Sequence, residues 1–394
     1  MLNTQFSPWP SYSEEEAEAA KNVILSNQVN YWTGELCKRF EFEFAKMVGV
    51  DYAISVSNGT VALELALRAL GVQAGDEVIV PSRTFVADAS VVASIGATPI
   101  FTDVELDSGN ICHKSIEKNI TSNTKAIICV HLAGWPCAME EIMALAEKHN
   151  LFVVEDCAQA HGAMLNGQPV GSFGHVSCWS FCQDKIITTG GEGGMVVTNC
   201  DSLFQFMWSY KDHGKDYNLI NNTPSEIPGF KWLHSSLGSN FRMTEVQAAI
   251  GLLQLKKLDK WIERRNHIAA KLRSTFSQFD FLDCPEYPNN ILHAQYKLYT
   301  YVNLDKAPQD VTRSSILLEM LSHGIPCFEG ACSEVYLEKV FESSQIVPVN
   351  RLPNAKKLGD ISLMFLVHPS LTDEEVGYMC ETIKSVLRKV SNLK

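Results

Sequence analysis

A lysine and an aspartate stand where two apolar segments of this sequence end. Lys185 lies in Ser180-Phe-Cys-Gln-Asp-Lys185, ahead of a run of glycines, and Asp156 directly follows Leu151–Glu155. A lysine amine can hold an aldehyde as an imine, and a buried carboxylate can keep a pyridine nitrogen protonated. Most lysines are surface residues, and an aspartate after a strand more often caps a helix. Together, however, the two residues predict a pyridoxal phosphate (PLP) site and chemistry on amines.

The phosphate and the ring of such a cofactor also need partners, and the sequence offers candidates. Ser57-Asn-Gly-Thr60 joins a short apolar strand to an apolar helix. Gly59 and Thr60 would therefore offer free backbone N–H groups to an anion. Ser180 could add a hydroxyl to the same phosphate site. Phe85 is the candidate for stacking on the ring, although a phenylalanine in such a segment is more often part of the core.

Other kinds of site are less well supported. The glycines of residues 190–194 are not followed by the lysine of a nucleotide-binding loop and do not open a helix. His131, His161, His213 and Glu192 are scattered, without the spacing of a metal site. The twelve cysteines form no CxxC pair, which indicates reduced, mostly buried thiols rather than disulfides or a metal cluster.

The composition is that of a soluble globular enzyme. The chain has 394 residues, of which 46% are hydrophobic and 20% are charged. Its net charge of -12, without long basic stretches, argues against a nucleic-acid partner. No apolar run is long enough for a membrane helix, and the N-terminus lacks the features of a secretory signal. We therefore expect a cytoplasmic protein.

Short apolar strands alternate with helical segments along the first two thirds of the chain. This pattern predicts an α/β fold with a mostly parallel sheet that is covered on both faces. Ligands of such sheets collect at the carboxyl ends of the strands. The predicted strands are Ala53–Ser57, Glu77–Pro81, Pro99–Asp103, Ala126–Leu132, Leu151–Glu155, Val176–Phe181 and Met195–Thr198.

The pattern changes after a long helix that we expect to begin at Thr244 and to reach about Phe276. A strand near Tyr299 and helices at 314–323 and 374–390 follow, which predicts a smaller α+β domain. We place the large domain at residues 14–265 and the small C-terminal domain at 266–394, with residues 1–13 as an arm. The polar segment 216–234 is a candidate for an active-site loop.

Taken together, these segments resemble the DegT/StrS family of sugar aminotransferases, along nearly the whole chain. The resemblance implies fold type I of the PLP-dependent transferases. No single segment is diagnostic, but their order is very specific. The matching segments are Ser57-Asn-Gly-Thr-Val-Ala-Leu63, Gly75-Asp-Glu-Val-Ile-Val-Pro81, Thr84-Phe-Val-Ala, Glu155-Asp-Cys-Ala-Gln-Ala-His-Gly162, Ser180-Phe-x-x-x-Lys185, Gly191-Glu-Gly-Gly-Met195 and Asn240-Phe-Arg-Met-Thr-Glu-Val-Gln247.

The resemblance assigns roles to the candidate residues. Lys185 would form the Schiff base and move protons, and Asp156 would pair with the pyridine nitrogen. The other cofactor contacts would be Phe85 on the ring, Gln159 near the ring hydroxyl, and Gly59, Thr60 and Ser180 on the phosphate. An asparagine matching Asn240 reaches the phosphate from the neighbouring subunit in similar enzymes. The resemblance therefore implies a homodimer with shared active sites.

The implied reaction has two halves. L-glutamate gives its amino group to PLP and leaves as 2-oxoglutarate, and the amino group then passes to a keto- or aldehydo-sugar. Relatives that act as dehydratases have histidine in place of the lysine, so Lys185 favours transamination. The cysteine spacing of the iron–sulfur relatives is absent.

The sugar is less narrowly defined by the sequence. Ser180–Lys185 and Gly330-Ala-Cys-Ser-Glu-Val-Tyr336 are similar to the family branch that contains the 8-amino-Kdo transaminase. That branch implies amination of 8-oxo-Kdo, a sugar acid of lipopolysaccharide. The alternative is a nucleotide-sugar 3- or 4-aminotransferase, although Asn30–Gly34 departs from the turn common there. Three basic residues could bind a carboxylate or form structural ion pairs: Arg83, Lys215 and Arg242.

Two hypotheses from other functional classes of protein remain open at this point. A PLP-binding regulator without turnover would absorb visible light but would not be converted by glutamate. A binding protein without PLP would show no visible absorbance. The combination of Lys185, Asp156 and the phosphate turn favours an enzyme over both.

Overall fold

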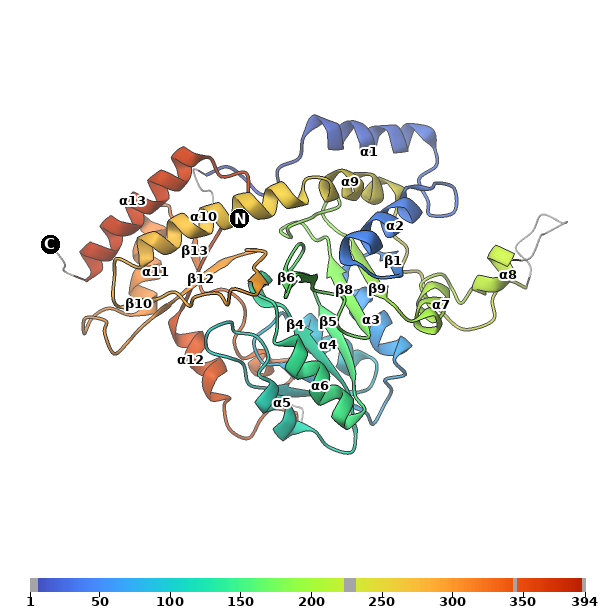
Figure 1. Ribbon diagram of the computed structural model, residues 1–394, viewed down its shortest axis with the longest axis horizontal. Coiled ribbons are helices and arrows are strands. Elements are labelled where there is room, and N and C mark those ends of the chain that lie inside the picture. The colour runs from blue at the N-terminus through green and yellow to red at the C-terminus, as the bar shows by residue number, and fades with distance from the viewer. Residues whose placement is uncertain (1–5, 223–231, 343–345, 392–394) are drawn as a thin grey trace.

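A computed structural model describes residues 6–222, 232–342 and 346–391. Its centre is a seven-stranded sheet with the strand order β1-β9-β8-β5-β4-β2-β3 (Figure 1). β9 runs antiparallel to both of its neighbours, and the other strand pairs are parallel. The predicted, mostly parallel α/β sheet is therefore confirmed. Its strands are β1 (Tyr52–Val56), β2 (Glu77–Pro81), β3 (Thr98–Thr102), β4 (Thr124–Val130), β5 (Phe152–Asp156), β8 (Val176–Ser180) and β9 (Gly194–Thr198).

Helices cover both faces of this sheet because successive strand residues point to opposite sides. Val78 and Val80 of β2 belong to one buried apolar cluster, with α3 (Gly59–Ala69), α4 (Ala87–Ser94) and α7 (Asp201–Tyr210). Ile79, between them, packs in a second cluster on the other side. That second face is covered by α5 (His113–Asn119), α6 (Met139–His149), α2 (Leu36–Val48) and α9 (Glu245–Leu255).

The C-terminal part of the chain forms its own apolar cluster around a four-stranded sheet, in the order β10-β12-β14-β13. In Figure 1 it lies beside the large sheet, at the left of the view. The domain boundary at residue 265 falls inside α10 and stays a prediction. The elements are α10 (Leu258–Phe276), β10 (Leu282–Asp283), β12 (Leu298–Val302), α11 (Arg313–Ser322), β13 (Cys327–Phe328), α12 (Pro353–Ile361), β14 (Ser362–Phe365) and α13 (Asp373–Val390).

The long helix expected from Thr244 to Phe276 is two helices. Thr244 caps α9 as predicted, with its side chain accepting a hydrogen bond from Gln247 N. The helix ends at Leu255, where the N–H of Lys257 bonds to Gln254 O, three residues back, in a tight turn. Apolar periodicity continues through that turn, so the sequence pattern could not reveal the break. Figure 1 shows α10 continuing from α9 and running alongside the C-terminal part.

Outside these two sheets the chain forms a third, small sheet and further helices. A three-stranded sheet is formed by β6 (Met164–Leu165), β7 (Gln168–Pro169) and β11 (Ile291–Leu292). The N-terminal helix α1 (Glu14–Ser26) begins with a capping contact, since Ser13 N donates to Glu16 Oε2 at 2.7 Å. Within the expected loop 216–234, Tyr217–Asn222 forms α8, and residues 223–231 lie outside the described residues. The helices of the described part include none that is both long and apolar enough to cross a membrane.

Close backbone contact holds the first turn of α3 against the sheet. A Cβ atom on Gly194, at the start of β9, would lie 2.5 Å from both the carbonyl carbon and the oxygen of Asn58. Neither backbone segment can yield without moving, since β9 pairs with β1 and β8 in the middle of the sheet. Glycine is therefore required at this position for steric reasons.

We expect Gly194→Ala to destabilise the protein by about 1–3 kcal/mol, the usual cost of overpacking a core. Urea unfolding followed by circular dichroism would measure the change. The matched control is Gly377→Ala, in the middle of α13, where an added Cβ meets nothing within 4 Å. It should be neutral or stabilising by up to about 1 kcal/mol. Equal effects of the two changes would contradict the packing argument.

Candidate functional site

A cavity of about 1070 Å³ opens where β1, β5 and β8 end. Its lining includes the ends of these strands, the loop after β8, and residues of the C-terminal part. Seven of the eight predicted site residues line it: Gly59, Thr60, Phe85, Asp156, Gln159, Ser180 and Lys185. The sheet thus brings together residues that are far apart in the sequence.

Lys185 is held in the loop that follows β8. Its backbone N–H donates to Cys182 O at 3.0 Å, and its carbonyl accepts a hydrogen bond from Trp9 Nε1 at 2.9 Å. Its amine Nζ lies 5.0 Å from the centre of the Tyr296 ring. The backbone of the lysine is therefore fixed from both sides, while its side chain reaches into the cavity.

Asp156 is the last residue of β5 and is buried at the bottom of the cavity. Its Oδ1 accepts a hydrogen bond from Ala158 N at 2.8 Å. Burial raises the pKa of this carboxyl, while the Ala158 amide, Asp88 and the positive charge of Lys185 favour the ionised form. A cationic ring nitrogen placed beside Asp156 would add to these favourable interactions.

Asp88, which the sequence pattern did not single out, is a second acid beside Asp156. It is fully buried in the first turn of α4, and its Oδ2 accepts a hydrogen bond from Thr84 Oγ1 at 2.5 Å. Its Oδ1 finds no donor among the described residues. Burial, and next the charge of Asp156, raise the pKa of Asp88 well above its ordinary value. The raised pKa favours the protonated form of Asp88, next to the carboxyl group of Asp156.

The predicted phosphate turn has the shape of an anion cradle. Asn58 caps α3, with its Oδ1 accepting a hydrogen bond from Val61 N at 3.0 Å, so the N–H groups of Gly59 and Thr60 have no partner within the helix. Ser180 lies directly opposite, since a Cβ on Gly59 would be 2.8 Å from the Ser180 Cβ. Any larger residue at position 59 would fill the cradle.

The two predicted ring contacts are also placed at the cavity. Gln159 is oriented by the N–H of Ala133, which donates to its Oε1 at 2.7 Å. Phe85 lines the cavity with 66% of its surface exposed. Such exposure is unusual for a large aromatic residue and leaves its ring available to cover a bound group.

Asn240 and two of the proposed carboxylate-binding residues lie elsewhere. Asn240 is exposed, pairs with Asp212 through the backbone, and is not part of the cavity lining. The side chain of Asp212 forms ion pairs with Lys215 at 3.2 Å and with Arg242 at 2.5 Å. These two basic residues are thus paired with an acid of their own chain.

Arg83, the third candidate for binding a carboxylate, and the N-terminal turn Asn30–Gly34 also make their contacts outside the cavity. Arg83 is buried and donates from Nη1 to Ser333 Oγ and Ser362 Oγ, both at 3.0 Å. In the turn Asn30–Gly34, Trp32 Nε1 donates to Asp212 Oδ2 at 2.5 Å. Neither Arg83 nor this turn lines the cavity of its own chain.

The C-terminal part supplies cavity residues that carry no motif of their own. Tyr296, Lys297 and Tyr299 reach the cavity from the beginning of β12, and Tyr299 Oη accepts a hydrogen bond from Ala331 N at 2.8 Å. The segment Gly330–Cys332 lines the same side. The tyrosines at positions 296, 299 and 301, in and just before β12, were the available clue, but such residues are equally typical of a core.

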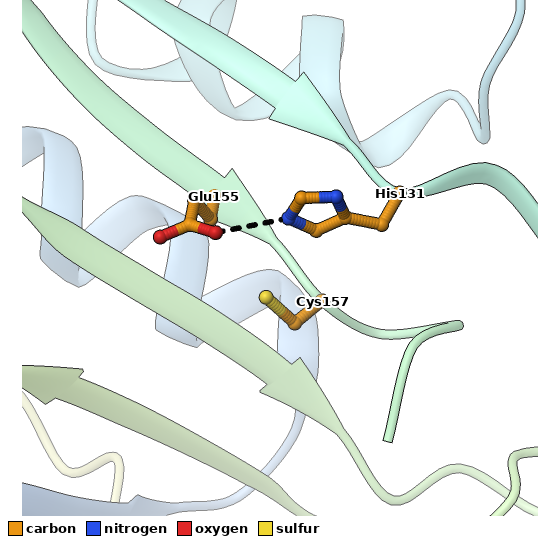
Figure 2. A group of neighbouring side chains, drawn as sticks. All are labelled: His131, Glu155 and Cys157. Carbon is orange, nitrogen blue, oxygen red and sulfur yellow. Dashed lines mark hydrogen bonds and ion pairs between the residues drawn. The ribbon is translucent and has the colours of Figure 1, made fainter. Parts of the chain in front are cut away.

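A second group of polar side chains, His131, Glu155 and Cys157, lies on the other side of β5 (Figure 2). His131 Nε2 bonds to Glu155 Oε2 at 3.0 Å, and His131 Nδ1 accepts from Cys137 N at 2.9 Å. Burial raises the pKa of the Cys157 thiol well above its ordinary value. Glu155 accepts three further hydrogen bonds, from the N–H groups of Gly171, Phe173 and Gly174.

These contacts occupy the atoms that would bind a metal. Both ring nitrogens of His131 and both oxygens of Glu155 have partners, and the thiol keeps its proton. The group is therefore a buried hydrogen-bond network that joins the end of β4 to the turn before β8. That no metal binds elsewhere stays a prediction.

The cavity fits PLP in its donor chemistry. The cradle at Gly59 and Ser180 offers backbone N–H groups and a hydroxyl to a phosphate. Asp156 offers a buried carboxylate to a ring nitrogen, and Lys185 offers an amine. Phe85 offers an exposed aromatic face.

The chain matches the family model described as the DegT/DnrJ/EryC1/StrS aminotransferase family over residues 10–384. It is 36% identical over 374 residues to GDP-perosamine synthase of Escherichia coli O157:H7, covering 95% of this chain and 96% of that one. It is 34% identical to UDP-N-acetyl-3-dehydro-alpha-D-glucosamine 3-aminotransferase of Acidithiobacillus ferrooxidans, covering 92% of each chain. The crystal structure of an aminotransferase from Psychrobacter cryohalolentis superposes with a TM-score of 0.96 at 52% identity, covering 98% of this chain and 99% of that one.

The protonated Asp88 makes the stability of the fold depend on pH. Above the ordinary carboxyl pKa near 4, the folded protein binds one more proton at this site than the unfolded chain. Wild-type stability should therefore fall relative to Asp88→Asn by about 1.4 kcal/mol for each pH unit, up to the raised pKa. The amide of the Asp88→Asn variant keeps an N–H donor toward Asp156 but has no proton to lose.

Urea midpoints of the wild type and Asp88→Asn between pH 4 and pH 8 would measure this difference. Asp280→Asn, a change of an exposed acid, is the matched control and should follow the wild-type curve. Parallel curves for wild type and Asp88→Asn would show that Asp88 is ionised in the fold and would contradict the raised pKa.

Proposed function

This chain belongs to the DegT/DnrJ/EryC1/StrS aminotransferase family, and from that premise we propose that it transfers the amino group of L-glutamate to a keto carbon of a nucleotide-linked sugar. The family membership itself makes the protein a PLP-dependent aminotransferase of sugars. A regulator without turnover and a binding protein without PLP are therefore not retained. The observation that carries the proposal is the meeting of Lys185, Asp156 and the Gly59–Ser180 cradle in one cavity.

Bound PLP supplies an electron sink and carries the amino group between the two substrates. Asp156 holds the ring nitrogen in its protonated form, because its carboxylate is buried and has few other partners. The Nζ of Lys185 would move the proton between the substrate carbon and C4′ of the cofactor in each half of the reaction. Both residues extend from backbone that the sheet and Trp9 hold in place.

The remaining site residues position the cofactor. Gly59, Thr60 and Ser180 hold the phosphate through N–H and hydroxyl groups at the start of α3. Phe85 would stack on the ring of the cofactor, and Gln159 would lie near the ring hydroxyl group. Asn240 is exposed and away from its own cavity, which supports a homodimer in which it reaches the phosphate of the partner's site.

Two observations support a nucleotide-linked acceptor. The names of the two curated relatives refer to a GDP-linked and a UDP-linked amino sugar, and each relative matches more than 90% of this chain. The cavity also has a volume of about 1070 Å³, with space beyond Lys185 toward Gly330–Cys332. A cytoplasmic location would suit these substrates.

A second candidate is the amination of 8-oxo-Kdo to 8-amino-Kdo for lipopolysaccharide. It is favoured by Ser180–Lys185 and Gly330–Tyr336, the segments that are similar to the corresponding branch of the family. Residues of both segments line the cavity. The relatives described above instead name nucleotide sugars, and we therefore rank this candidate second.

We expect the purified protein to show the visible absorbance of bound PLP and to lose it on addition of glutamate, with release of 2-oxoglutarate. Lys185→Ala should lower the rate of this half-reaction by about 10³-fold or more, since it removes both the amine and the proton carrier. Rapid-mixing absorbance would measure the rate. The exposed Lys46→Ala is the control. A Lys185→Ala protein that reacts at the wild-type rate would refute the assignment.

The acceptor is tested on the glutamate-treated protein, which carries the amino group. GDP-linked 4-keto, UDP-linked 3-keto and 8-oxo-Kdo substrates should be offered in parallel, with aminated product followed by mass spectrometry. We expect turnover of a nucleotide-linked sugar. Turnover of 8-oxo-Kdo alone would replace the proposal with the second candidate.

A further inference from the structure

Lys297 is a second basic residue at the cavity, and no step proposed above uses it. The basic side chains that line the cavity in the described part of the chain are Lys185 and Lys297. Within residues 6–222, 232–342 and 346–391, Lys297 forms neither an ion pair nor a hydrogen bond through its ammonium group. Resting on the proposed function, we infer that Lys297 binds the α-carboxylate of the amino donor.

The position of Lys297 suits a group next to the reacting carbon. Its Nζ lies 4.6 Å from the centre of the Tyr296 ring, and the Nζ of Lys185 lies 5.0 Å from the centre of the same ring. Both amines therefore gather around one tyrosine. The α-carboxylate of an amino acid is attached to the carbon that exchanges its proton with Lys185, so it must lie within a few ångströms of that amine.

The electrostatics around Lys297 favour an anion. Against the larger effect of burial, the negative charge of the nearby Asp184 acts to raise the pKa of Lys297. The Asp184 carboxylate, however, accepts a hydrogen bond from Tyr296 Oη and does not form an ion pair with Lys297. Burial lowers the pKa of Lys297 to about 8, and the charges of Arg265 and Lys185 act in the same direction. A carboxylate beside the ammonium group would offset both effects.

The other basic residues considered above do not line the cavity, and each interacts with groups elsewhere. Arg265 donates to the carbonyl oxygens of Gln295 at 3.2 Å and Tyr296 at 3.4 Å, and Arg83 donates to two serine hydroxyls. Lys215 and Arg242 pair with Asp212. Among the residues of its own chain that the structure describes, Lys297 is thus the cation at the cavity, other than Lys185, that remains for a substrate carboxylate.

The test compares Lys297→Gln with Lys297→Arg, which keeps the charge. Calorimetric titration of the PLP-loaded protein with glutarate, a dicarboxylate without an amine, measures anion binding without turnover. Loss of a charge-assisted hydrogen bond predicts that Lys297→Gln weakens glutarate binding by about tenfold or more. Lys297→Arg should stay within about threefold of the wild type. Lys125→Gln, which also removes an amine near an aromatic ring but away from the cavity, is the matched control.

A second comparison identifies which carboxylate is bound. Isoglutamine lacks the α-carboxylate of glutamate, and glutamine lacks the γ-carboxylate. Lys297→Gln should weaken the apparent binding of glutamate and glutamine, measured from the loss of visible cofactor absorbance, but leave isoglutamine unchanged. If isoglutamine is weakened while glutamine is not, Lys297 binds the γ-carboxylate and the inference is overturned.

These experiments distinguish a failure of the Lys297 inference from a failure of the proposed function. If glutamate bleaches the wild type and Lys297→Gln binds glutarate like the wild type, this inference alone is wrong. If glutamate does not bleach the wild type, the proposed function fails and the inference falls with it. Melting temperature and visible absorbance show whether each variant keeps its fold and cofactor. Lys297→Met, which retains the aliphatic stem, replaces Lys297→Gln if the latter loses PLP.

Discussion

The burial of the Asp156 carboxylate is the constraint on which the rest of the site depends. A carboxylate removed from water is costly unless donors or cations face it, and burial raises its pKa. The surroundings of Asp156 reduce that cost: the Ala158 amide donates to it, and both Asp88 and the charge of Lys185 favour its ionised form. Asp156 is thereby prepared for a protonated ring nitrogen before any ligand arrives.

The alternation of side chains along β5 gives two neighbouring acids different roles. Asp156 faces the cavity, whereas Glu155 points to the opposite side and binds His131 and the turn before β8. The hydrogen bonds of Glu155 hold that turn against the sheet, and β8 carries Ser180 and leads to Lys185. A structural acid and a cofactor-binding acid can thus be adjacent in sequence, because a strand turns successive residues to opposite faces.

Much of this arrangement could be read from the sequence, because the information was local. The strands of the sheet, the turn that opens α3 and the helix start at Thr244 follow from apolar runs and turn or capping residues, and the structure has them within a few residues of their predicted limits. The break between α9 and α10 was missed, since the apolar pattern continues across it. Asp88 and Lys297 were missed: Asp88 directly follows the matching segment Thr84–Ala87 but is not part of it, and Lys297 lies in no matching segment. Two of the three basic residues that could bind a carboxylate, Lys215 and Arg242, pair with Asp212.

The sequence by itself determined the candidate groups of the site: a lysine, an acid after a strand, and a glycine turn that opens a helix. Only the tertiary structure decided which other residues join them. Parallel strands end at one edge of a sheet, so residues 59, 156 and 185 meet there whatever lies between them. Whether a charge such as that of Asp88, Lys215 or Lys297 is paired, protonated or free depends on its distance to groups from distant segments. Those distances exist only once the two parts of the chain have packed together.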